Sequence, residues 1–143
     1  MQLTRIARFL LAGFGLLLAA HSRAEIVVIV AANSPIATLS QAQVSDIFLC
    51  KSATFPGGSL AVPLDQVEGS PIRLEFYNKT TGKTPELLKA YWSKMIFTGQ
   101  GEPPREITDS EKIKKLVANN PHYIGYVDKS AVDSSVKMVL SIR

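Results

Sequence analysis

Four stretches of the chain have the apolar pattern of β-strands. Residues 25–32 form a continuous β-branched run, which is typical of a strand buried on both faces, as in a parallel sheet. Apolar residues alternate over 60–64, where Pro63 cannot donate a ladder hydrogen bond and therefore predicts a short or edge strand. Two later runs, at 123–127 and 136–141, complete the predicted sheet.

Helical periodicity separates these strands, and each helix follows a capping residue. The predicted helices are 41–49 behind the Ser40–Gln43 capping box, 71–78 behind Ser70, 85–97 behind Thr84, and a helix from a Thr108–Glu111 capping box to Asn119. Strands that alternate with helices predict the α/β class. We expect one small three-layer domain with a mixed, mostly parallel sheet.

The first residues have the pattern of an export signal. Arg5 and Arg8 precede an apolar run at 9–20, and Ser22 and Ala24 are small residues at the two positions that signal peptidase reads. The run is shorter than the roughly 20 residues that span a membrane, which disfavours the alternative of an uncleaved anchor. We therefore expect a signal peptide at 1–24, a single mature domain at 25–143 and a periplasmic location.

Charge and composition narrow the classes of function. Removal of residues 1–24 takes away three arginines, so the formal charge falls from +4 to +1 and predicts no nucleic-acid-binding face. One cysteine and one remaining histidine, Cys50 and His122, provide no metal-binding cluster. We interpret Cys50 as a half-buried structural thiol. Without a nucleophile, base and orienting group, the sequence predicts neither an enzyme nor a cofactor.

The most informative local pattern lies at 64–73, where a strand ends, a glycine turn follows and a helix begins. The first amides of a helix have no internal partner and lie at the positive end of its dipole, so they can bind phosphate or sulfate. The alternative is an ordinary capped helix in which the Ser70 hydroxyl accepts a hydrogen bond from the Arg73 amide. The local pattern alone favours this alternative.

Three segments, in order, resemble the second lobe of the periplasmic phosphate-binding proteins of ABC transporters. Residues 39–51 are similar to the family's "D-I-F-L-G-K" helix end, and 120–127 are similar to its "P-G-A-I-G-Y-V". Between them, 68–70 stand where the family has an acidic residue, glycine and serine. Together with the strand at 25–32, the resemblance covers nearly the whole mature chain. It implies one lobe of a type 2 periplasmic binding protein.

The resemblance also implies a set of ligand contacts. Gly69, Ser70 and the backbone amide of Ile72 would hold the anion, and Glu68 would accept a proton from hydrogen phosphate. Gln66 stands where the family has an arginine, and the lost charge-assisted contact is worth about 1.5–3 kcal/mol.

Two further departures concern donors at the helix start. Pro71 replaces a glycine and removes a backbone donor, and Ile72 replaces a threonine and removes a hydroxyl. Arg73 lies one turn into the helix and would compensate for the arginine that Gln66 replaces if it faced the anion.

The resemblance implies a periplasmic solute-binding module for phosphate or a related oxyanion, serving an ABC transporter or a sensing system. The alternative is a non-catalytic interaction domain of the same fold that has lost tight phosphate binding and docks on a membrane sensor or transporter component. Because the family closes two lobes over its ligand, a homo-dimer or a membrane partner would supply the second wall.

Overall fold

The computed structural model describes residues 25–143, so the predicted signal peptide lies outside the described residues. The elements are β1 (Ile26–Ala31), α1 (Gln41–Phe48), β2 (Val62–Gln66), α2 (Pro71–Thr81), α3 (Pro85–Phe97), β3 (Arg105–Ile107), α4 (Ser110–Ala118), β4 (Tyr123–Asp128), the 3-10 turn η1 (Lys129–Ala131) and β5 (Val136–Ile142). Within this part of the chain, no helix is both long and apolar enough to span a membrane.

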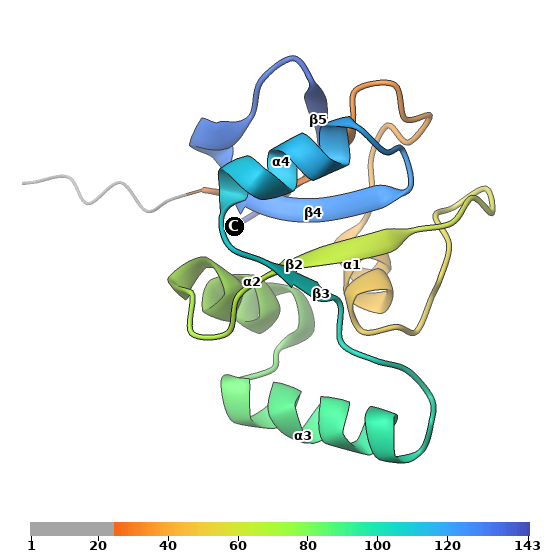
Figure 1. The fold of residues 1–143 in the computed structure, drawn as a ribbon, viewed down its shortest axis with the longest axis vertical. Helices are drawn as coiled ribbons and strands as arrows, with labels where there is room; N and C mark the ends of the chain where they lie inside the picture. The colour runs from red at the N-terminus through yellow and green to blue at the C-terminus, as the bar shows by residue number, and fades with distance from the viewer. Residues whose placement is uncertain (1–24) are drawn as a thin grey trace, which may run out of the picture.

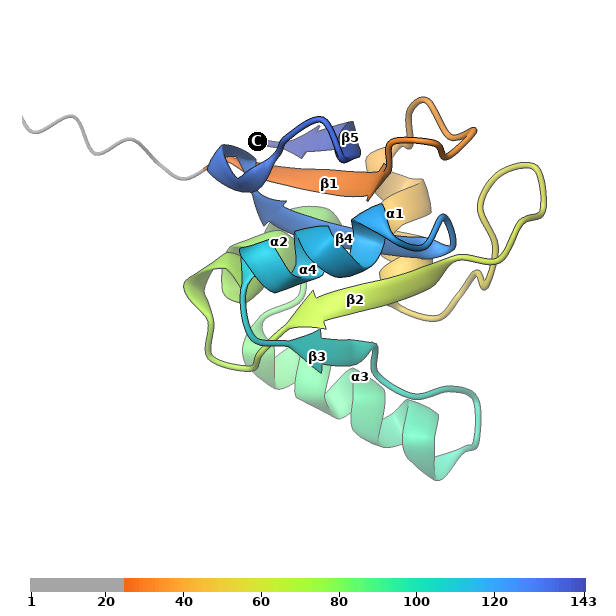
Figure 2. The same ribbon diagram turned by 45° about the horizontal axis from the view of Figure 1, so that its top comes forward.

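The five strands form one mixed sheet in the order β3-β2-β4-β1-β5. β2 pairs parallel with β3 and β4, whereas β1 pairs antiparallel with β4 and β5. Only β1 therefore opposes the common strand direction, and the prediction of a mostly parallel sheet is confirmed (Figure 2). β1 is buried along its whole length, as predicted. Both of its neighbours are antiparallel, however, so its burial reflects helices and loops on both faces rather than parallel pairing.

Pro63 lies in an internal strand of five residues, so the edge position, one of the two predicted alternatives, is wrong. β2 lies between β3 and β4, with Pro63 opposite Ile124 of β4. Pairing with β3 begins only at Leu64, one residue later. The missing N–H therefore interrupts no bond to β3, and the proline is tolerated for the same reason as in an edge strand.

Helices cover both faces of the sheet, giving the three layers that the sequence predicts (Figures 1 and 2). α4 packs on one face, while α1 and α2 cover the other and α3 lies beside the β3 edge. α4 approaches β4 closely at Gly125, where an added Cβ would lie 2.5 Å from Cγ2 of Ile113. This contact explains why only glycine fits at that position of the central strand.

The helix boundaries follow most of the predicted caps. Ser40, Ser70 and Thr84 each accept a hydrogen bond from the amide three residues later. α2 continues to Thr81, beyond its predicted end at residue 78, and stops at Gly82 in the left-handed conformation.

The fourth predicted cap was wrong. Asp109 rather than Thr108 caps α4, and its carboxylate accepts a 2.8 Å bond from the Lys112 amide. Thr108 instead directly follows β3, a three-residue strand that the sequence analysis missed.

Cys50 is exposed, so the prediction of a half-buried thiol was wrong. It follows the end of α1 with a φ of 58°, the left-handed region that disfavours residues with a side chain. Its thiol donates to the Glu102 carbonyl at 3.3 Å, whereas the His122 ring nitrogen lies 3.1 Å from the Leu60 carbonyl. Cys50 and His122 therefore have separate hydrogen-bond partners.

Candidate functional site

The start of α2 follows β2 after a four-residue turn. Gly69 has a φ of 85°, which makes the turn possible for glycine, and Ser70 is the extended N-cap residue. The Ser70 hydroxyl accepts a 3.3 Å bond from the Arg73 amide, as the ordinary capping interpretation predicts. The amides of Gly69 and Ile72 make no hydrogen bond within residues 25–143. The helix start is therefore capped and still has two free backbone donors.

The start of α2 lies at the end of the sheet to which the strands β2, β3 and β4 run, that is, at their carboxyl ends (Figure 2). Ligands of open α/β sheets bind at the carboxyl ends of the strands. Because β1 is antiparallel to its neighbours, Ile26 near its start lies opposite both Asp128 and Ile142 at this edge. The start of β1 and the end of β5 thus lie at the same end of the sheet as the turns that follow β2 and β4.

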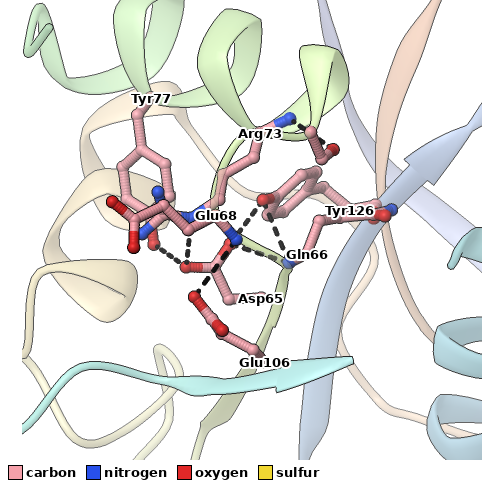
Figure 3. Close-up of polar contacts among 8 residues, drawn as sticks. Asp65, Gln66, Glu68, Arg73, Tyr77, Glu106 and Tyr126 are labelled. Carbon is pink, nitrogen blue, oxygen red and sulfur yellow. Dashed lines mark hydrogen bonds and ion pairs between the residues drawn. The ribbon is translucent and has the colours of Figure 1, made fainter. Parts of the chain in front are cut away.

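A buried carboxylate lies beneath the helix start and was missed by the sequence analysis. Asp65 of β2 is 1% exposed. One oxygen accepts from the Gln66 amide at 2.8 Å and from the Tyr126 hydroxyl, and the other accepts from Arg73 Nε at 3.2 Å and the Tyr77 hydroxyl at 2.8 Å (Figure 3). Asp65 therefore joins β2, α2 and β4.

Burial determines the protonation of this cluster. Desolvation raises the pKa of the Asp65 carboxyl, and the hydrogen bond from Tyr126 and the charge of Arg73 oppose that rise. Burial and the neighbouring Asp65 carboxylate raise the pKa of both Tyr77 and Tyr126. The two phenols consequently remain hydrogen-bond donors at neutral pH. Loss of one partner from such a buried ion pair costs about 3–5 kcal/mol, because the other charge loses its compensation.

Two of the predicted ligand residues are turned into the domain. Gln66 is 3% exposed, and its side-chain amide donates to Ser110 Oγ at 3.1 Å and the Tyr126 carbonyl at 3.3 Å. The Arg73 side chain is 14% exposed and forms the ion pair with Asp65. Arg73 therefore anchors the first turn of α2 to Asp65, whereas Gln66 links β2 to β4 and to the start of α4.

The other predicted residues gather at the helix start itself. Glu68, Gly69, Ser70 and Ile72 come from the turn and the first residues of α2. Glu68 is exposed, and its amide donates to a carboxylate oxygen of Glu106 on β3 at 3.2 Å (Figure 3). Two carboxylates thus flank the free amides, which weakens the attraction of this helix end for an anion.

A hollow of about 470 Å³ lies at the start of α4, and it is the other possible site at this end of the sheet. Its lining includes Gln66 and Ser110, together with the three acidic residues Asp109, Glu111 and Asp128, and no lysine or arginine. Three carboxylates disfavour an oxyanion there. The start of α2 is the better candidate for an anion site.

No family model and no curated protein matches the sequence. Several solved structures do match. A protein from Clostridium perfringens described as a phosphate ABC transporter substrate-binding protein, solved with bound phosphate, matches with 27% identity and a TM-score of 0.65. The described domain resembles one lobe of a phosphate-binding protein. The match covers 80% of this chain and 44% of that chain, so this chain corresponds to less than half of the larger protein.

Two further structures support the same fold. An ABC-type phosphate transport receptor from Vibrio cholerae is 16% identical with a TM-score of 0.63, and the match covers 80% of this chain and 45% of that one. PstS from Borrelia burgdorferi is 11% identical with a TM-score of 0.57, with coverage of 80% and 46%. The single-lobe fold predicted from the sequence is confirmed by these matches.

Proposed function

We propose that this protein is a periplasmic solute-binding module for phosphate or a related oxyanion, with its site at the start of α2. The free amides of Gly69 and Ile72 beside the Ser70 hydroxyl are the observation that carries the proposal. The Clostridium perfringens protein, which was solved with bound phosphate, supports the choice of anion. In this proposal the signal peptide is removed after residue 24, the domain of residues 25–143 binds reversibly without chemistry, and a transporter or sensor receives the ligand.

The contacts at the helix start predict weak binding by this chain alone. Two backbone amides and one hydroxyl contribute about 1 kcal/mol each, and the helix dipole contributes about 0.3–1 kcal/mol. The sum of about 3–4 kcal/mol corresponds to a Kd in the millimolar range. The flanking carboxylates of Glu68 and Glu106 lower the affinity further, whereas a second wall that excludes water would raise it.

A second candidate function is an interaction domain that has lost tight anion binding. The internal bonds of Gln66 and the ion pair of Arg73 with Asp65 favour it, because these side chains are already satisfied within the domain. In that case the surface at the carboxyl ends of β2, β3 and β4, beside the start of α2, would contact a membrane sensor, a transporter component or a second copy of the chain. Binding of phosphate distinguishes the two candidates.

The test is thermal unfolding with sodium phosphate, with sulfate for anion selectivity and chloride at matched ionic strength. At tenfold excess over the Kd, binding adds about 1.4 kcal/mol, which raises Tm by about 5 °C for a domain of this size. Ser70→Ala should lower Tm and weaken the response to phosphate, because the lost hydroxyl contributes about 1 kcal/mol to binding. Ser40→Ala removes an equivalent cap from α1 and should lower Tm while the response to phosphate persists. An unchanged Tm in phosphate would refute the oxyanion module and favour the interaction domain.

A further inference from the structure

The hollow at the start of α4 is rich in groups that accept hydrogen bonds. Asp109, Glu111 and Asp128 contribute carboxylates to its lining, which includes no lysine or arginine. Gln66 and Asp128, the last residues of β2 and β4, both line it. Ligands of open α/β sheets bind at the carboxyl ends of the strands, so the hollow is placed where this class of fold holds small molecules.

Asp109 and Asp128 each keep a free carboxylate oxygen at the hollow. One oxygen of each accepts from a backbone amide of the helical turn that it caps, at 2.8 and 2.9 Å respectively. The second oxygen accepts no hydrogen bond, and neither carboxylate forms an ion pair, within residues 25–143. Glu111, by contrast, is paired with Lys114 at 2.9 Å. Two carboxylates at the hollow are therefore not compensated by a cation of the domain.

Gln66 adds an acceptor that the domain leaves unsatisfied. The residue is 3% exposed, and its side-chain nitrogen donates to Ser110 Oγ and to the Tyr126 carbonyl. Its side-chain oxygen accepts no hydrogen bond from any described residue. In the described part of the chain, Trp92 Nε1 is the one fully enclosed side-chain polar atom without a partner, so the Gln66 oxygen is not sealed inside the domain. It therefore opens to the hollow that Gln66 lines.

These acceptors match a cation that carries several N–H donors. A guanidinium group has five N–H donors in one plane and can bridge separate acceptors, whereas an ammonium group presents three donors from a single point. A metal ion matches less well, because no three acidic, histidine or cysteine side chains in residues 25–143 are placed to hold one. At about 30 Å³ for each water molecule, 470 Å³ corresponds to about sixteen waters, which is ample for a guanidinium group on a short chain.

We propose that the hollow at the start of α4 binds a guanidinium group. The group donates to the free oxygens of Asp109 and Asp128 and to the side-chain oxygen of Gln66. The hollow shares no residue with the turn before α2 or with α2 itself, so this binding does not depend on phosphate. Free arginine and an arginine side chain of a partner protein present the same group, and the probes are chosen to separate these two sources.

The test is a titration in chloride buffer without phosphate, followed by the backbone amide NMR signals. Nα-acetylarginine amide represents an arginine side chain in a protein, and free arginine represents the small molecule. The amides of Asp109, Ser110 and Asp128 should shift and saturate together. Nα-acetyllysine amide should bind about tenfold or more weakly than its arginine counterpart, because it lacks the bridging donors. Tetramethylammonium, which has the charge but no N–H donor, should give no saturating shift at matched ionic strength.

Three substitutions of aspartate by asparagine provide matched variants. Asp109→Asn and Asp128→Asn remove a charge but keep a capping oxygen, since asparagine and aspartate are equally good caps. Each should raise the Kd of Nα-acetylarginine amide about tenfold. Asp46→Asn in α1 is the control, because Asp46 is exposed and does not line the hollow, and it should leave the Kd unchanged. Melting curves establish that the variants are folded.

The outcomes decide the site and its source. Tighter binding of Nα-acetylarginine amide than of free arginine supports the site and assigns it to a partner's side chain, and the reverse supports the site and assigns it to the small molecule. Equal binding of the arginine and lysine amides, saturating shifts with tetramethylammonium, or an unchanged Kd in Asp128→Asn overturns the guanidinium site. None of these results bears on phosphate at the start of α2, which is titrated separately.

Discussion

Tyr126→Phe tests the hydrogen bonds that hold the buried Asp65 carboxylate. The substitution removes the hydroxyl that donates to Asp65 and keeps the ring, which stacks on Phe76 with a centroid distance of 3.8 Å and an interplanar angle of 5°. A hydrogen bond to a charged group is worth about 1.5–3 kcal/mol. At roughly 4 °C for each kcal/mol in a domain of this size, Tm should fall by about 6–12 °C. Calorimetry or urea unfolding at neutral pH measures the loss.

The pH dependence of unfolding tests the same hydroxyl independently. The pKa of Tyr126 is raised in the folded protein by burial and by the Asp65 carboxylate, so the unfolded chain releases its phenol proton first. The stability due to the protonated hydroxyl is therefore fully present below a pH of about 10 and declines above it. In Tyr126→Phe the free energy of unfolding should fall less steeply above that pH.

Tyr123→Phe is the control on the same strand. Its hydroxyl makes no hydrogen bond within residues 25–143, and we expect a change within about 0.5 kcal/mol. Equal effects of Tyr126→Phe and Tyr123→Phe would refute the reasoning that the phenol of Tyr126 stabilises the buried carboxylate.

Two further predictions concern the backbone. Cys50→Gly should be about 0.5–1 kcal/mol more stable than Cys50→Ala, because glycine adopts the left-handed φ of 58° without strain. The entropy that glycine gains in the unfolded chain offsets part of this relief. Equal urea midpoints for the two variants would contradict the prediction. Gly125→Ala should cost about 1–3 kcal/mol through overlap with Ile113. Combined with Ile113→Ala, it should cost less than the sum of the single changes in a double-mutant cycle, and strict additivity would argue against the overlap.

Much of the fold could be predicted because its signals are local. The β-branched run of β1, the caps at Ser40 and Ser70, and the stripe of α3 each fix an element from neighbouring residues. β3 has only three residues, and its position depends on pairing with β2, which a local pattern does not reveal. The cap of α4 was missed because Thr108 and Asp109 are both good caps, and the end of β3 determines which one is used.

The site could be predicted only in part. Gly69 and Ser70 were identified from the turn and the helix start, which are local features. The directions of Gln66 and Arg73 depend on contacts with Ser110 and Asp65 from other elements, so the sequence could not show that they turn inward. A charged residue near the end of an otherwise apolar strand was the one available signal for Asp65.

The most direct test of the central claim is a titration with sodium phosphate followed by the backbone amide NMR signals of the protein, with chloride at matched ionic strength. Binding at the start of α2 predicts that the amides of Gly69, Ser70 and Ile72 shift most and saturate together. Unchanged signals at these three amides, or shifts confined to the start of α4, would contradict an oxyanion site at the start of α2.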